Sequence, residues 1–181
     1  MNIRLLICLT VVLLGGCSSA KDVSRAQSVV YDPTTSARIR LFGNNGLPVA
    51  IKPGQDCAST EEPVLAYGYT VADKLNSTLG RHTNQSIGMP ASWRSDHPNY
   101  GESYSEFVIP AGKPSVILMK MEAGEVFCLP SARVLVPQAG QDYEAYLTRK
   151  DGMCSGTVRL LSALESPGTA ADVPVGICVQ K

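Results

Sequence analysis

Short segments that alternate between apolar and polar residues, each ended by a turn signal, recur along most of this chain. In residues 36–43 (SARIRLFG) the apolar side chains share one face of an extended strand and the two arginines share the other. Asn44-Asn45-Gly46 follows as a strong turn signal, because asparagine and glycine tolerate positive φ angles. Twelve prolines and 16 glycines are scattered without a period. This pattern predicts a mainly β fold, a two-sheet antiparallel β-sandwich built from short strands.

About nine strands are expected from the alternation and the turns between them. They lie at 36–43, 47–52, 63–69, 102–109, 115–121, 126–136 (interrupted at Leu129-Pro130), 143–148, 157–164 and 175–180.

One short helix is expected after the third strand, where Val71, Leu75 and Leu79 recur every four residues. Thr70 can cap its start and Gly80 can end it. A continued strand is the alternative.

The N-terminus has the features of a secretory signal. Arg4 precedes an apolar run over 5–14, and Leu14-Gly15-Gly16-Cys17 ends it. This ending resembles the lipobox of bacterial lipoproteins, which implies cleavage before Cys17 and lipidation of its thiol. Ser18, in place of an aspartate, then implies sorting to the outer membrane, with the chain lipid-anchored and facing the periplasm. A transmembrane anchor is disfavoured because a spanning helix needs about 20 apolar residues; an ordinary signal with a chance cysteine is the other alternative.

The predicted organisation is therefore a signal peptide over 1–16, a lipidated cysteine with a flexible tether over 17–35, and a β-sandwich domain over 36–181. Lysine plus arginine and aspartate plus glutamate number 16 each. The signal holds one of the basic residues and none of the acidic ones, so the mature chain is near −1. This balance argues against a nucleic-acid partner, and no motif indicates a cofactor.

Four cysteines remain in the mature domain, and in an oxidising periplasm they predict two disulfides. They are Cys57, Cys128, Cys154 and Cys178. Metal binding is the competing interpretation, but no Cys-x-x-Cys or paired-histidine spacing is present. Three pairings exist, and Cys57–Cys128 with Cys154–Cys178 is favoured because the second pair flanks one candidate hairpin.

Residues 80–101 follow no regular pattern, and such long stretches in a compact domain are often functional. Aromatic and basic residues in and beside this stretch have the composition of an interaction hot spot. The candidate binding residues are Arg81, Trp93, Arg94, His97, Tyr100 and Tyr104. Alternatively, these side chains cover the end of the sandwich core.

Catalytic patterns are weak. His82, His97 and Asp96 make a poor metal set, and no Gly-x-Ser-x-Gly occurs. Glu102 and Glu106 are spaced like a glycosidase pair, but they share parity on a strand, which favours a solvated face. The chain is therefore not expected to be an enzyme.

The segments FVIPAGKPSVIL (107–118), FCLPSARVLVPQAGQDYEAYL (127–147) and SIGMP (86–90) resemble proteobacterial envelope lipoproteins with an immunoglobulin- or transthyretin-like sandwich. The resemblance implies that fold and brings no known activity with it. The expected function is a non-catalytic protein-binding or assembly module of the cell envelope, with an envelope protein as partner. A periplasmic inhibitor or immunity protein against an envelope-targeted enzyme is the alternative, and a hydrolase is less favoured.

Overall fold

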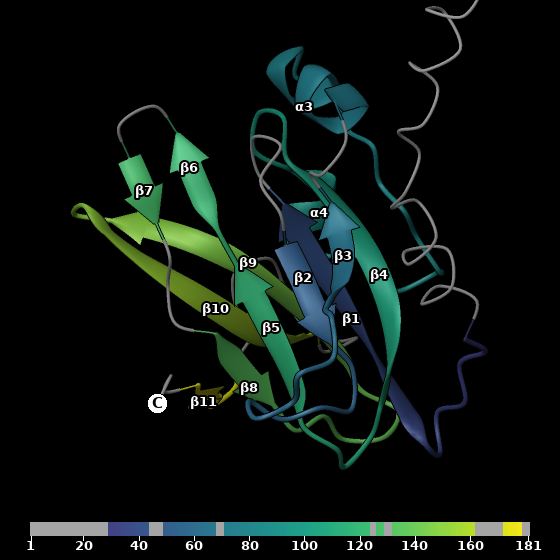
Figure 1. Cartoon of the computed structure of the whole chain (residues 1–181). Coiled ribbons are helices and arrows are strands. Elements are labelled where there is room, and N and C mark those ends of the chain that lie inside the picture. The colour runs from purple at the N-terminus through teal and green to yellow at the C-terminus, as the bar shows by residue number, and fades with distance from the viewer. Residues whose placement is uncertain are drawn as a thin grey trace, which may run out of the picture.

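The computed structural model describes residues 29–43, 49–67, 71–123, 126–128, 132–161 and 172–178, and within them the fold is mainly β, as predicted (Figure 1). The strands are β1 (Ser36–Gly43), β2 (Val49–Lys52), β3 (Val64–Tyr67), β4 (Ser103–Pro110), β5 (Ser115–Met119), β6 (Met121–Ala123), β7 (Val126–Cys128), β8 (Arg133–Leu135), β9 (Asp142–Lys150), β10 (Met153–Leu161) and β11 (Gly176–Ile177). The helices are α3 (Val71–Thr78) and α4 (Trp93–Asp96). No helix in the described ranges is long and apolar enough to cross a membrane.

The first sheet has the strand order β10-β9-β1-β4 and is mixed. β1 is antiparallel to β4 but parallel to β9. The prediction of two antiparallel sheets is therefore wrong for this sheet. A parallel pair needs a long crossover between its strands, and here most of the second sheet intervenes between β1 and β9. Local hairpin signals do not reveal a neighbour that is so far away in sequence.

The second sheet has the order β11-β8-β5-β2-β3, and its strand pairs are antiparallel. β6 and β7 form a separate two-stranded hairpin, so the predicted strand at 126–136 is divided between β7 and β8. In Figure 1 the second sheet lies in front of the first, and β6 and β7 stand at the upper left of the two sheets.

Apolar side chains of both sheets form one buried cluster. From β1 it takes Ala37, Ile39 and Leu41, each fully buried. These are the residues that the alternation of 36–43 places on one face, so the predicted inward face is confirmed. Ile117 of β5 and Phe107 of β4 join the same cluster, which therefore lies between the sheets.

The predicted helix is present over 71–78, and Gly80 just after it has a φ of +68°, as expected of a helix stop. Thr70, the predicted cap, lies outside the described residues. The buried side of α3 is polar: Ser77 is buried, and its Oγ donates to the carbonyl of Gly101 at 3.0 Å. Gly101 has a φ of +66°, and a Cβ there would lie 2.4 Å from the carbonyl oxygen of Ser77, so this approach requires glycine.

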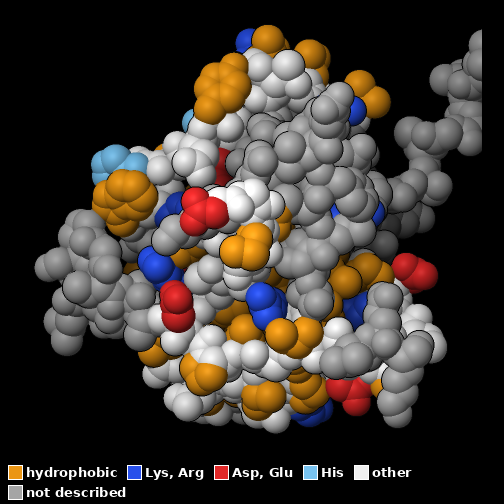
Figure 2. Space-filling model, turned by 90° about the vertical axis from the view of Figure 1, so that its left-hand side faces the viewer, with side chains coloured by type: hydrophobic (Ala, Val, Ile, Leu, Met, Phe, Trp, Pro, Cys, Tyr) orange, Lys and Arg blue, Asp and Glu red, His pale blue; other side chains and the backbone are white. Residues whose placement is uncertain are grey.

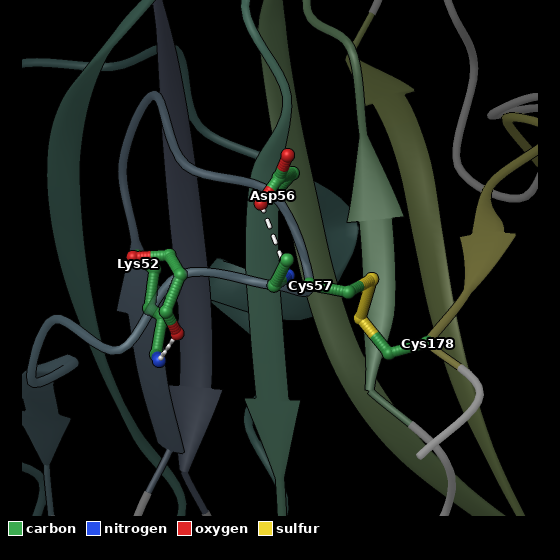
Figure 3. The surroundings of a disulfide bond; sticks show 6 residues. Lys52, Asp56, Cys57 and Cys178 are labelled. Carbon is green, nitrogen blue, oxygen red and sulfur yellow. Dashed lines mark hydrogen bonds between the residues drawn. A yellow bond between two sulfur atoms is a disulfide. The ribbon is translucent and has the colours of Figure 1, made fainter. Parts of the chain in front are cut away.

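A disulfide joins Cys57, in the loop after β2, to Cys178, just after β11, with Cα atoms 5.6 Å apart (Figure 3). The favoured pairing of Cys57 with Cys128 and of Cys154 with Cys178 is therefore wrong. It assumed that the last strand stays beside β10, whereas β11 pairs with β8 in the second sheet. Cys154 is also disulfide-bonded, and the side chain of Cys128 lies outside the described residues.

Candidate functional site

The outer face of the first sheet carries a row of charged residues of alternating sign. In the strand register Arg40 of β1 lies opposite Glu106 of β4 on one side and Glu144 of β9 on the other. Arg159 of β10 lies opposite Glu144 and extends the row to the next strand. Cross-strand pairs of opposite charge stabilise a sheet, so this row favours the order β10-β9-β1-β4.

Arg40 and Glu106 form a buried ion pair in this row, with exposures of 1% and 0%. The Nε and Nη2 atoms of Arg40 donate to Oε1 of Glu106 at 2.9 and 2.6 Å. Nη2 also donates to the carbonyl of Pro90 at 2.8 Å, and the guanidinium lies 4.8 Å from the centre of the Tyr104 ring. Buried charges are tolerated when they are both paired and hydrogen-bonded, and this pair meets both conditions.

Residues 81–101, called the cap below, lie against this charged face. The backbone of Gln85 bonds to β4 on both sides of Ser105, donating to Tyr104 and accepting from Glu106, each at 2.9 Å. The helix α4 begins with a capping box between Ser92 and Ser95. The cap therefore forms defined hydrogen bonds with the sheet, although its sequence shows no strand or helix period.

Glu106 anchors the cap through its second carboxylate oxygen. Oε2 accepts from the Ser86 hydroxyl at 2.7 Å, from the Ile87 amide at 2.7 Å and from the Met89 amide at 3.2 Å. Burial raises the pKa of Glu106, but the hydrogen bonds from Ser86, from Arg40 and from the two amides outweigh burial and hold this pKa below its ordinary value. One carboxylate thus ties β1, β4 and the cap together.

Arg94 clamps the cap onto the aromatic side chains of the sheet. Its Nη2 donates to Oε1 of Glu102 at 2.6 Å. Its guanidinium lies 4.1 Å from the centre of the Tyr146 ring and 5.3 Å from that of Phe42. Glu102 is buried as well, and it accepts from the amide of Asn99 at 3.2 Å. The aromatic stacking and the ion pair together hold α4 in place.

The prediction that Glu102 and Glu106 lie on a solvated face is wrong, because the cap covers that face. Their arginine partners come from α4 and from β1, the latter 66 residues away from Glu106 in sequence. Parity along a strand identifies which residues share a face, but not what covers that face.

Arg38 adds a second tie between sheet and cap. It forms a bidentate pair with Asp142, both bonds at 2.7 Å, and its Nη1 donates to the carbonyl of Gly88 at 3.0 Å. Arg159 pairs with Asp172 at 2.8 Å near the surface. Glu144 differs from the other acids: it is buried, and its Oε2 has no hydrogen-bond partner among the described residues.

The charged groups of this face mostly satisfy one another, so their arrangement supports the fold more directly than it supports proton transfer. Glu102 and Glu106 each accept from an arginine, and within the described ranges no three metal-ligating side chains gather. The Nδ1 of His82 is hydrogen-bonded to the carbonyl of Glu102, and that of His97 to the carbonyl of Trp93.

The six predicted binding residues divide into two groups. Arg94 lies over the Tyr146 ring of β9, and the ring of Tyr104, a residue of β4, lies beside the Arg40 guanidinium, so both side chains contact the outer face of the first sheet. The others are exposed: Trp93, Arg81, His97 and Tyr100. Trp93 is 56% exposed, and its ring stacks on that of His97 with centres 5.1 Å apart.

Sequence reasoning missed the residues that hold the cap, chiefly Arg38, Arg40, Ser86 and Asp142. Two arginines on the outward face of a strand that is otherwise apolar were the available signal. An arginine at such a position is usually solvated, so the signal becomes informative only with the partner carboxylates in view.

Comparisons with protein families, with curated proteins and with solved structures found no match to this chain. The function proposed below therefore depends on the residues and contacts of the chain alone.

Proposed function

We propose that this protein is a lipid-anchored component of the cell envelope, modified at Cys17, that binds another envelope protein without catalysing a reaction. The Leu-Gly-Gly-Cys ending of the apolar N-terminal run supports the anchor. Among the described residues, Tyr31 contacts the sheet, because its ring lies 4.4 Å from the Arg38 guanidinium. The 13 residues between Cys17 and Tyr31 would serve as the tether.

The strand order supports the transthyretin-like alternative for the sandwich over the immunoglobulin-like one. Leaving out the β6–β7 hairpin and β11, and lettering the remaining strands A to H along the chain, the sheets are D-A-G-H and C-B-E-F. The immunoglobulin constant order places A beside B in one sheet. The order found here, with A between D and G, is the one that a transthyretin-like sandwich implies.

The observation that carries the binding proposal is the exposed Trp93 on a cap that is held by buried ion pairs. Rigid, exposed aromatic side chains bind with little loss of conformational entropy, and tryptophan is among the residues enriched in binding hot spots. Trp93 follows Ser92 of the capping box directly and precedes Arg94, so both of its neighbours are fixed. A solvent-exposed tryptophan in such a position favours recognition over packing.

Trp93→Ala is expected to leave the melting temperature nearly unchanged, because most of the side chain is outside the core. Loss of a hot-spot tryptophan costs about 2 kcal/mol or more in binding, so capture of the envelope partner should weaken at least tenfold. Thermal unfolding and pull-down from solubilised envelopes measure the two effects. Arg94→Ala is the matched control, which should lower stability; equal capture by Trp93→Ala and the unchanged protein would contradict the proposal.

Cys17→Ser is expected to abolish both palmitate labelling and membrane fractionation, because the lipid chains would supply the membrane affinity. Metabolic labelling and sedimentation of membranes test this. A Cys17→Ser protein that still sediments with the membrane would defeat the anchor while leaving the binding proposal to the Trp93 experiment.

A further inference from the structure

The apolar residues that predicted the helix are not part of the buried cluster between the sheets: Val71 and Leu75 belong to α3, and Leu79 follows it directly. Val71 is 87% exposed, Leu75 57% and Leu79 54%. They lie four residues apart and therefore form one stripe along the helix and its last turn. Tyr100 borders the stripe, because its hydroxyl donates to the carbonyl of Thr78 at 3.0 Å while most of its ring is exposed. Figure 2 shows hydrophobic side chains gathered at the upper end of the molecule, where Figure 1 places α3.

This stripe exceeds the scattered exposure that is normal for a surface. Two leucines, a valine and a tyrosine together present on the order of 400 Å² of apolar area, and patches of that size usually mark a contact. A helix with an apolar stripe is stable when the stripe is covered. The stripe is not the side of α3 that bonds to the rest of the fold. Among the described residues that bond comes from the polar Ser77, which donates to the carbonyl of Gly101.

We propose that the α3 stripe is a self-association surface whose occupant is the same stripe of a second copy. The stripe is symmetric about Leu75, since Val71 and Leu79 lie four residues to either side. A two-fold axis at Leu75 therefore places Leu75 on its own copy and Val71 on Leu79 of the other chain, apolar on apolar in an isologous contact. The same axis places Lys74 of one copy opposite Asn76 of the other, so the two Lys74 side chains do not face each other.

The size and charge of the chain fit this occupant. Twice the stripe area, with a polar rim, reaches about 1,000 Å², the low end for a specific interface. Lysine plus arginine equals aspartate plus glutamate at 16 each, so two copies do not repel strongly. We therefore expect a weak dimer, which is populated only where the local concentration of the protein is high.

A membrane surface is the less favoured occupant because of where the tether joins the fold. Gly43 and Ser103 pair at the end of the sheet near α3, whereas Tyr31 and Ser36 lie at the other end of β1. The eight residues of β1 separate these ends by about 25 Å. The proposed anchor precedes Tyr31 in the chain and therefore joins the fold at the end of β1 opposite to the stripe.

The full mature chain carrying Cys17→Ser is used for the test, so that no lipid contributes to association. Analytical ultracentrifugation should show a concentration-dependent monomer–dimer equilibrium with a dissociation constant between about 10 µM and 1 mM. Leu75→Asp should weaken it at least tenfold with an unchanged melting temperature. Met153→Asp, at an exposed methionine of β10, is the matched control and should leave dimerisation as it was.

Crosslinking at position 75 tests the geometry of the dimer, because the two-fold axis brings residue 75 of one copy against residue 75 of the other. Leu75→Cys should form a covalent dimer on mild oxidation, and Met153→Cys should not. A protein that stays monomeric up to about 1 mM, or a Leu75→Asp variant that dimerises normally, overturns the inference. A monomer that binds anionic vesicles through Leu75 overturns it in favour of a membrane. The Trp93 and Cys17 experiments are independent of this result, so its failure and that of the proposed function are distinguishable.

Discussion

Glu106→Ala is expected to lower the free energy of unfolding by about 3–5 kcal/mol, because removing one partner of a buried ion pair leaves an uncompensated charge. Here the abandoned charge is Arg40, and three donors of the cap also lose their acceptor. Chemical denaturation followed by circular dichroism measures the loss. Asp172→Ala is the matched control: it breaks the pair with Arg159, in which Asp172 is exposed, and exposed pairs contribute about 0–1 kcal/mol.

The same carboxylate makes stability depend on pH. The folded-state pKa of Glu106 lies below its ordinary value, so its contribution is present above the unfolded-state pKa and is lost as pH falls through the folded-state pKa. Glu106→Gln cannot ionise and should lack this component, so the difference in stability between it and the unchanged protein should shrink as the solution is acidified below pH ~4. A difference that stays constant from neutral to acidic pH would show that the pKa of Glu106 is the same in the folded and unfolded protein, and a difference that grows on acidification would show that folding raises this pKa.

Replacing Cys57 and Cys178 together with alanine is expected to cost about 4–5 kcal/mol, because the disulfide closes a loop of 121 residues and loop-closure entropy grows with length. The double replacement is preferred, since a single one leaves a free thiol that can mispair. Equilibrium denaturation measures the loss, and reduction of the unchanged protein should lower its stability at least as much. Recovery of Cys57 joined to any other cysteine in peptides from non-reduced protein would contradict the pairing.

A second disulfide is expected from the first if the proposed processing at Cys17 takes place. Cys154 is bonded, and Cys57 and Cys178 are paired with each other; under the proposed cleavage before Cys17 and lipidation of its thiol, the remaining cysteine is Cys128. The same peptide map should therefore recover Cys128 with Cys154. Its loop is shorter than that of the first disulfide, so its removal should cost less.

Local patterns predicted the elements of this fold. The inward face of β1, the helix at 71–78 and its stop at Gly80 each follow from a period or a backbone preference within a few residues. These features can be predicted from short segments, because the side-chain period of a strand or helix and the glycine that ends a helix depend on residues close together in sequence. The mainly β class follows for the same reason, although the described residues hold eleven strands where about nine were expected.

Long-range contacts determined the rest. The solvated face expected for Glu102 and Glu106 became a buried charged layer, because arginines from β1 and α4 and the cap converge there. The parallel neighbour of β1, the partner of Cys57 and the exposure of Leu75 likewise depend on where distant segments come to lie. Alternation and spacing state which residues share a face, whereas burial, charge pairing and crosslinks require knowing what packs against that face.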